Sequence, residues 1–302
     1  MSRGVACRPA DRAARPRGVP GAPEIVDVAG IPMSALVSRA PAPRAVIVAM
    51  HGGMTTGRYF DVPELPRQSL LRTASALGFT VVAPDRPGVG ASAPHERLFA
   101  DSARRRVDLV HGLLDALVPP GSRGAGLFVV GHSRGTELAL QLAADERGAD
   151  LLGVEIAATG RRLHPEAEKV MARHRRGERP SGLDTVLWGP ERLYPESVAR
   201  GLRVFAPNPS YEAVEGPRWQ EMLPRYAAAV RVPVHLTLGD HERWWQTGPE
   251  ALADLAALFT AAPRVVAEMQ ADAGHNLSLG RTALAYHLRV LSFAEECAAA
   301  RG

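Results

Sequence analysis

The sequence is poor in cysteine and nearly devoid of lysine. Its two cysteines, Cys7 and Cys297, lie near opposite ends of the chain. Two cysteines cannot build a disulfide framework, and neither stands at zinc-ligand spacing from a second cysteine or a histidine. This pattern favours a reducing, cytoplasmic environment. Lys169 is the only lysine among 36 basic residues, a bias typical of a GC-rich gene.

Long hydrophobic runs are also missing. No stretch approaches the roughly 18 apolar residues of a membrane-spanning helix, so the sequence predicts no membrane partner. Residues 1–23 are rich in arginine, proline, glycine and alanine, but they lack the apolar stretch of a secretory signal. We expect these residues to form a disordered leader.

The chain has little excess of positive over negative charge, and few aromatic residues. The formal net charge is only +4, and aromatics make up 5% of the residues. Arginines cluster locally at Arg104–Arg106 and at Arg173, Arg175 and Arg176, which we interpret as solvated helix faces. Few aromatics leave little surface on which nucleobases can stack. The sequence therefore predicts no nucleic-acid partner.

Apolar residues, in contrast, make up 46% of the 302 residues, enough for the core of one large domain. Short apolar runs alternate with segments of helical periodicity, which predicts an α/β fold with a mostly parallel sheet flanked by helices. The expected strands are an opening hairpin, 24–28 and 33–38, followed by 45–50, 79–83, 127–130, 151–156, 233–238 and 264–269. The expected helices are 68–77, 101–117, 136–144 and 281–298.

The segment from 160 to 231 differs from the rest of the chain. It combines many prolines and charges with the large aromatics Trp188, Tyr194, Phe205, Tyr211 and Trp219. A connection of this length inside a compact domain is usually functional. We predict a helical cap at 160–231, inserted between two parts of the core at 24–159 and 232–302. Some of the cap aromatics are expected to line a pocket mouth.

The strongest catalytic signal is Gly131-His132-Ser133-Arg134-Gly135, a G-x-S-x-G pattern. It follows the apolar run LFVV and precedes the helical run TELALQLAA. A nucleophilic serine needs this context because a tight strand-to-helix turn, with small residues on either side, makes its hydroxyl project. The backbone N–H of Arg134 would then point at a developing oxyanion near the positive end of the helix. The pattern predicts Ser133 as a nucleophile.

A serine hydroxyl is a weak nucleophile and needs a base. His275 follows the last predicted strand and precedes the closing helix, the place where a base should lie, so we predict His275 in this role. The base in turn needs a carboxylate to orient it. Asp240 and Glu242 both follow the strand 233–238 and are alternatives for that carboxylate. Glu155, at the end of the strand 151–156, is the next choice.

A second glycine-rich turn, His51-Gly52-Gly53-Met54, follows the first long strand. Its glycines allow a backbone N–H to approach a substrate closely. We predict the N–H of Gly53 as a second oxyanion donor beside that of Arg134, with the N–H of Met54 as the alternative.

Together these motifs resemble the α/β-hydrolase superfamily, in particular its serine esterases and thioesterases. The chain order of Ser133, acid and His275 is the order in these enzymes. In similar sequences the acid stands three residues after a glycine, as in G-x-H-D, and this register selects Glu242 over Asp240. The stretch from Asp85 to Ser92, DRPGVGAS, is similar to their D-x-x-G-x-G-x-S turn, which is structural. No helix is expected to open there, because Pro94 follows.

The resemblance implies an α/β-hydrolase fold and acyl transfer to water, with no metal or organic cofactor. Ser133 is expected to attack an ester, thioester or lactone carbonyl of a small-molecule or carrier-bound acyl substrate. Two alternatives stay open. One is acyl transfer, cyclisation or elimination on a secondary-metabolite intermediate, and the other is a non-catalytic member that only binds a ligand.

Overall fold

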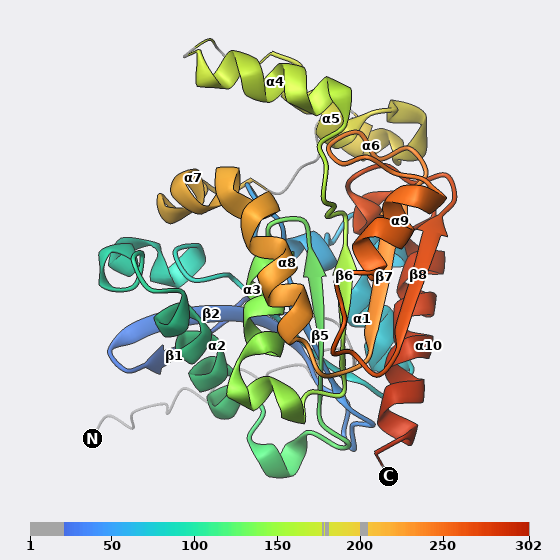
Figure 1. Cartoon of the computed structure of the whole chain (residues 1–302). Coiled ribbons are helices and arrows are strands. Elements are labelled where there is room, and N and C mark those ends of the chain that lie inside the picture. Colours follow the sequence, from blue (N-terminus) through green and yellow to red (C-terminus); the bar gives the residue numbers. More distant parts are fainter. Residues whose placement is uncertain (1–20, 177, 179–180, 200–204, 302) are drawn as a thin grey trace, which may run out of the picture.

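A computed structural model describes residues 21–176, 178, 181–199 and 205–301. These residues form an eight-stranded sheet in the order β1-β2-β4-β3-β5-β6-β7-β8 (Figure 1). The strands are β1 (Glu24–Val28), β2 (Ile31–Ser38), β3 (Val46–Met50), β4 (Thr80–Pro84), β5 (Leu127–His132), β6 (Gly153–Ala157), β7 (Val234–Gly239) and β8 (Val265–Gln270). β2 is antiparallel to both of its neighbours, and the other adjacent pairs are parallel. The predicted fold class, a mostly parallel sheet flanked by helices, is confirmed.

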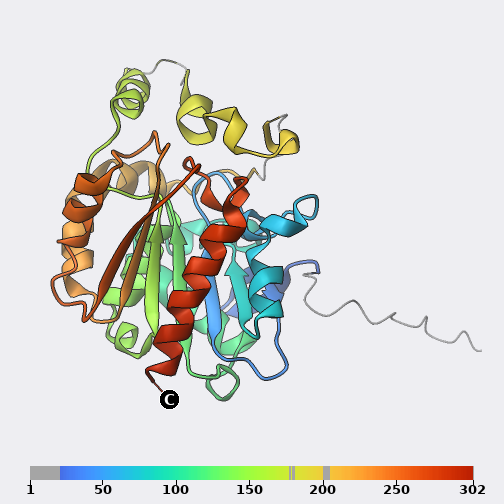
Figure 2. The ribbon, with the colours of Figure 1, turned by 90° about the vertical axis from the view of Figure 1, so that its right-hand side faces the viewer.

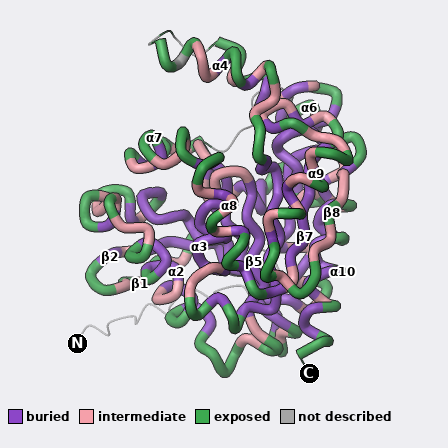
Figure 3. Tube along the Cα trace, viewed as in Figure 1, coloured by how far each residue is buried: buried purple, intermediate pink, exposed green. Residues whose placement is uncertain are grey.

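Helices cover both faces of the sheet (Figure 2). α1 (Leu70–Ala76) and α10 (Ala283–Ala299) pack on one face. The other face carries α2 (Ala103–Leu117), α3 (Gly135–Ala144), α8 (Trp219–Ala229) and α9 (Pro249–Ala256). Because both faces are covered, the central strands are buried along their whole length, and they appear as the purple interior of Figure 3. This explains why the sequences of β3, β4 and β5 are mostly apolar without alternation.

Apart from shifts of one or two residues at the ends of elements, sequence and structure differ in these places. α9 was not predicted. β5 continues through Gly131 and His132, two residues beyond the apolar run, because both still pair with β6. The expectation that no helix opens after the DRPGVGAS turn is wrong, since a 3-10 helix spans Gly90–Leu98 with Pro94 inside it. Proline does not exclude a helix in this chain, since the interior of α8 also contains Pro224.

Between β6 and β7 the chain forms α4 (Pro165–Arg175), α5 (Leu183–Trp188), α6 (Glu196–Ala199), α7 (Tyr211–Glu215) and α8. The first of these helices lie beyond the carboxyl ends of the strands (Figure 1), whereas α8 packs against α3. The division of the chain at residues 160 and 231 stays a prediction. Residues 1–20 of the predicted leader lie outside the described residues. In the part of the chain that the structure describes, no helix combines the length and apolarity needed to cross a bilayer.

A buried histidine on β7 should make stability depend on pH. His235 Nδ1 contacts a Glu155 carboxylate oxygen, and Nε2 lies 3.4 Å from Glu268 Oε2. Burial disfavours the imidazolium, but the two carboxylates outweigh that cost and raise the pKa of His235 above its ordinary 6.5. The stabilisation by this group is therefore complete below about pH 6.5 and is lost as the pH rises through the native pKa.

We expect the difference in unfolding free energy between the wild type and His235→Asn, from urea titrations, to shrink as the pH rises from about 6.5 through the native pKa of His235. His287→Asn is the control with the opposite sign, because burial lowers the pKa of His287 to about 3. Its wild-type advantage should fall as the pH drops below about 6.5. Parallel pH profiles for the two variants would contradict the assignment.

Candidate active site

Ser133 lies on a strained turn between β5 and α3. Its φ is +51°, in the left-handed region that residues other than glycine seldom adopt, and its N–H donates to the Ala157 carbonyl at 2.8 Å. A side chain at Gly131 would lie 2.8 Å from Ala139 Cβ, and one at Gly135 would collide with the Met50 carbonyl. Both glycines of the motif are therefore required for the turn to pack against α3 and β3.

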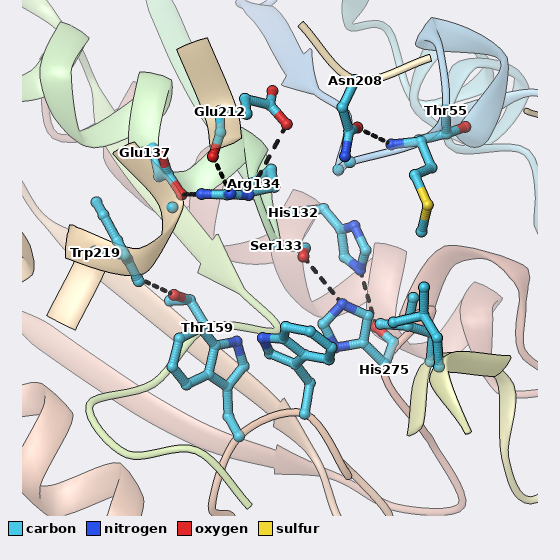
Figure 4. Close-up of a pocket in the computed structure, with 18 of the residues that line it drawn as sticks. Thr55, His132, Ser133, Arg134, Glu137, Thr159, Asn208, Glu212, Trp219 and His275 are labelled. Carbon is cyan, nitrogen blue, oxygen red and sulfur yellow. Dashed lines mark hydrogen bonds and ion pairs between the residues drawn. The ribbon is translucent and has the colours of Figure 1, made fainter. Parts of the chain in front are cut away.

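The turn brings the Ser133 hydroxyl to His275. The Oγ atom lies 3.0 Å from His275 Nε2 (Figure 4). His275 stands in the loop after β8, and its side chain is buried. A hydroxyl at this distance can donate its proton to the imidazole.

Of the candidate carboxylates, Glu242 reaches His275. Both of its oxygens lie 3.0 Å from His275 Nδ1, and Oε1 also accepts the N–H groups of Arg243 and Trp244. Glu242 is buried, which strengthens its attraction to an imidazolium. The carboxylate therefore both fixes the ring and holds the proton on Nδ1, leaving Nε2 free to accept.

The other two carboxylates are engaged elsewhere. Asp240 accepts the N–H groups of Asp272 and Ala273, each at 3.0 Å, and thereby supports the loop that carries His275. Glu155 bonds His235 and accepts the Tyr286 hydroxyl at 3.2 Å.

The glycine-rich turn lies directly against Ser133. A side chain at Gly52 would come within 3.3 Å of Ser133 Cβ. Of the two alternatives for the second oxyanion donor, the N–H of Met54 is already bonded to Asn208 Oδ1 at 2.6 Å (Figure 4). This arrangement favours Gly53. Arg134 is the residue before the first turn of α3, where the helix dipole is positive.

His132 is a site residue that sequence reasoning missed. Its Nε2 lies 2.9 Å from the His275 carbonyl, and its ring stacks on Tyr59 with centroids 4.4 Å apart. Burial and the neighbouring His275 lower the pKa of His132 to about 3, so it is neutral, and Nε2 must carry its proton because a carbonyl only accepts. His132, at the first unspecified position of the G-x-S-x-G pattern, thus supports the loop of His275. The pattern itself does not predict this contact.

A cavity of about 530 Å³ opens over Ser133 and His275. Its walls are largely apolar and come from the segment between β6 and β7, chiefly Leu163, Val170, Met171, Leu187, Trp188 and Trp219. Trp244 and Trp245, behind Glu242, close another side. Of the aromatics predicted at a pocket mouth, Trp188, Phe205 and Trp219 line the cavity. Tyr194 is instead buried. Tyr211 is half-buried, its hydroxyl donating to the Pro87 carbonyl and its ring lying under the Arg106 guanidinium.

The sheet order, the helices on both faces and the polar residues at the carboxyl ends of β5, β7 and β8 define an α/β-hydrolase fold. A sequence model of the alpha/beta hydrolase family matches residues 46–299, and the chain belongs to this family. A search of curated protein sequences finds no match.

Solved structures support the same fold. A thermostable carboxyl esterase from Bacillus coagulans is 18% identical, with a TM-score of 0.64 over 91% of this chain and 98% of that one. The thioesterase domain from the curacin biosynthetic pathway is 18% identical, with a TM-score of 0.59 over 90% and 99%. An N-acyl homoserine lactonase is 16% identical, with a TM-score of 0.62 over 92% and 98%. At these identities the likeness concerns the fold alone.

Proposed function

We propose that this protein is a serine hydrolase that cleaves an ester, thioester or lactone through an acyl-enzyme intermediate. The observation that carries the proposal is the unbroken hydrogen-bonded chain from Ser133 Oγ through His275 to the Glu242 carboxylate. Each member sits on a loop at the carboxyl end of a strand, beneath a cavity large enough for a substrate.

In this mechanism Ser133 Oγ attacks the substrate carbonyl while His275 Nε2 takes the hydroxyl proton. The resulting imidazolium is stabilised by Glu242 and returns the proton to the departing alcohol, thiol or ring oxygen. Water then attacks the acyl-enzyme, with His275 again as base, and releases the acid and free Ser133. The N–H groups of Gly53 and Arg134 hold the negative oxygen of each tetrahedral intermediate.

The cavity favours a substrate with a substantial apolar acyl group, free or attached to a carrier. Its lining is rich in aliphatic and aromatic side chains, and its volume lies within the range of pockets that enclose small molecules. The three similar structures are a carboxyl esterase, a thioesterase domain and a lactonase, which agrees with these three bond types as the candidates.

Labelling with a fluorophosphonate tests the proposal directly. The reagent should modify Ser133, and p-nitrophenyl esters should be hydrolysed in proportion to the unmodified fraction. Mass spectrometry of the digested protein locates the label. Modification of a different serine, or full hydrolysis by fully labelled protein, would overturn the proposal.

The cavity aromatics should set acyl-chain preference. Trp188→Ala and Trp219→Ala each enlarge the cavity, and we expect the ratio of kcat/KM for long over short acyl esters to rise about tenfold, in keeping with the free energy of one or two buried methylenes. The control is Phe259→Leu, a buried core aromatic just after the end of α9, which should lower stability and leave the ratio unchanged. An unchanged ratio in both tryptophan variants would show that these side chains only pack.

A further inference from the structure

The carbonyl of Gly52 is held by two donors. Arg86 Nη2 lies 3.0 Å from this oxygen, and His51 Nδ1 lies 2.8 Å from it. His51 Nε2 accepts the backbone N–H of Arg86 at 3.0 Å, so Nδ1 carries the ring proton. Burial and the Arg86 charge also lower the pKa of His51 well below its ordinary value, which keeps the ring neutral.

This anchoring determines where the N–H of Gly53 points. Gly52 C=O and Gly53 N–H belong to one trans peptide, in which the two groups point in opposite directions. Gly52 and Gly53 line the cavity, whereas Arg86 is buried behind them, only 3% exposed. Holding the carbonyl from behind therefore aims the N–H toward the cavity. A guanidinium on the carbonyl also polarises the peptide and strengthens the N–H as a donor.

Arg86 is itself held by the segment that closes the cavity. Its Nη1 is paired with Glu212 on α7, and the Glu212 side chain is 2% exposed. The backbone carbonyl of Glu212 accepts Arg134 Nη2 at 2.8 Å, as Figure 4 shows. Glu212 thus contacts both Arg86, which holds the peptide of the proposed donor Gly53, and Arg134, whose own backbone N–H is the other proposed donor.

Residues just before α7 also hold the other end of the glycine-rich turn, at Met54. Asn208 Oδ1 accepts the N–H of Met54, and the N–H of Ala206 donates to the Met54 carbonyl at 3.1 Å. Met54 has a φ of +56°, a conformation that needs such support because it is unfavourable for a residue with a side chain.

From these contacts we propose that Arg86, paired with Glu212, is a positioning residue that aims the Gly53 N–H at the oxyanion and links it to α7. The inference rests on the proposed serine-hydrolase function. It assigns a role to the DRPGVGAS turn, which otherwise has none in the chemistry.

Arg86→Met is the principal test, and Arg106→Met is its matched control. Arg106 is equally buried, pairs with Glu215 on the same helix, and donates to two backbone carbonyls, those of Phe99 and Ala100, but it does not touch the turn at 51–54. We expect Arg86→Met to lower kcat about 10- to 100-fold with KM within about threefold, since a misaimed oxyanion donor weakens only the transition state. Arg106→Met should lower the melting temperature comparably and leave kcat within about threefold.

Inhibition by a trifluoromethyl ketone distinguishes a positioning role of Arg86 from a purely structural one. Its adduct with a serine carries the oxyanion, so Arg86→Met should weaken inhibition by the same factor as kcat/KM, while the unreactive alcohol analogue binds unchanged. Glu212→Gln keeps the Arg86 contact to Gly52, so it should show a smaller loss of kcat and of trifluoromethyl ketone inhibition. This variant replaces Arg86→Met in the test if Arg86→Met does not fold.

The outcomes separate the two proposals. Fluorine NMR detects the adduct. If the wild type shows no adduct on Ser133, the serine-hydrolase function is overturned. Adduct formation in the wild type, with equal inhibition of Arg86→Met or equal kcat losses in Arg86→Met and Arg106→Met, would overturn the positioning role alone.

Discussion

Replacing Ser133 with alanine should lower turnover of an ester substrate by about three orders of magnitude or more. The substitution removes only the hydroxyl group whose oxygen lies 3.0 Å from His275 Nε2, so the acyl-enzyme route is lost. What remains is the catalysis that oxyanion donors and substrate binding give to direct attack by water. Alanine can occupy the same turn, so we expect the circular-dichroism spectrum to be unchanged.

Ser122→Ala supplies the control for that experiment, because Ser122 is exposed on a 3-10 turn before β5 and bonds only the Pro119 carbonyl among the contacts described. Its kcat should equal that of the wild type. Retention of most of the activity by Ser133→Ala would remove Ser133 from the mechanism.

The second large effect is expected at Glu242. Glu242→Gln should lower turnover by about two to four orders of magnitude. An amide can turn its NH₂ toward His275 Nδ1, which favours the tautomer with the proton on Nε2, and that ring cannot accept the serine proton. The substitution also removes the negative charge that stabilises the imidazolium in a buried site.

Asp240→Asn is the matched variant, two residues away in the same loop. Asp240 accepts the N–H groups of Asp272 and Ala273, whereas His275 Nδ1 is bonded to Glu242. Loss of the Asp240 carboxylate should therefore affect thermal stability more than kcat. Measuring kcat and melting temperature side by side decides between the two acids. A larger kcat loss in Asp240→Asn would transfer the orienting role to Asp240.

Much of the sheet could be predicted from sequence because the central strands are buried on both faces and are therefore mostly apolar, although β6 holds Glu155 and β7 holds His235. The strand end at His132 could not, since glycine and histidine look like the start of a turn although they still pair with β6. α9 was missed because its short PEALADLA sequence follows a long loop and has no polar N-cap side chain.

The three residues of the hydrogen-bonded chain were predictable because each stands in a local motif next to a strand end. Arg86, Asn208 and Glu212 were not, because their roles arise from contacts across the fold. Arg86 and Glu212 are 126 residues apart in the chain, and no local pattern marks such a pair. Local sequence thus specifies where the reactive groups stand, and tertiary packing specifies how the backbone donors beside them are aimed.

The segment between β6 and α8 begins and ends close together, because Trp219 Nε1 at its end donates to Thr159 Oγ1 at its start at 2.9 Å. A segment with adjacent ends can be exchanged or lengthened at little cost in loop closure, so this architecture allows new specificities to be grafted onto an unchanged sheet. The ion pair with Arg86 limits that modularity. A graft with neither a carboxylate nor an amide oxygen at the place of Glu212 leaves a buried guanidinium without a partner there, which is strongly destabilising. The two positions must therefore change together when such a segment is replaced.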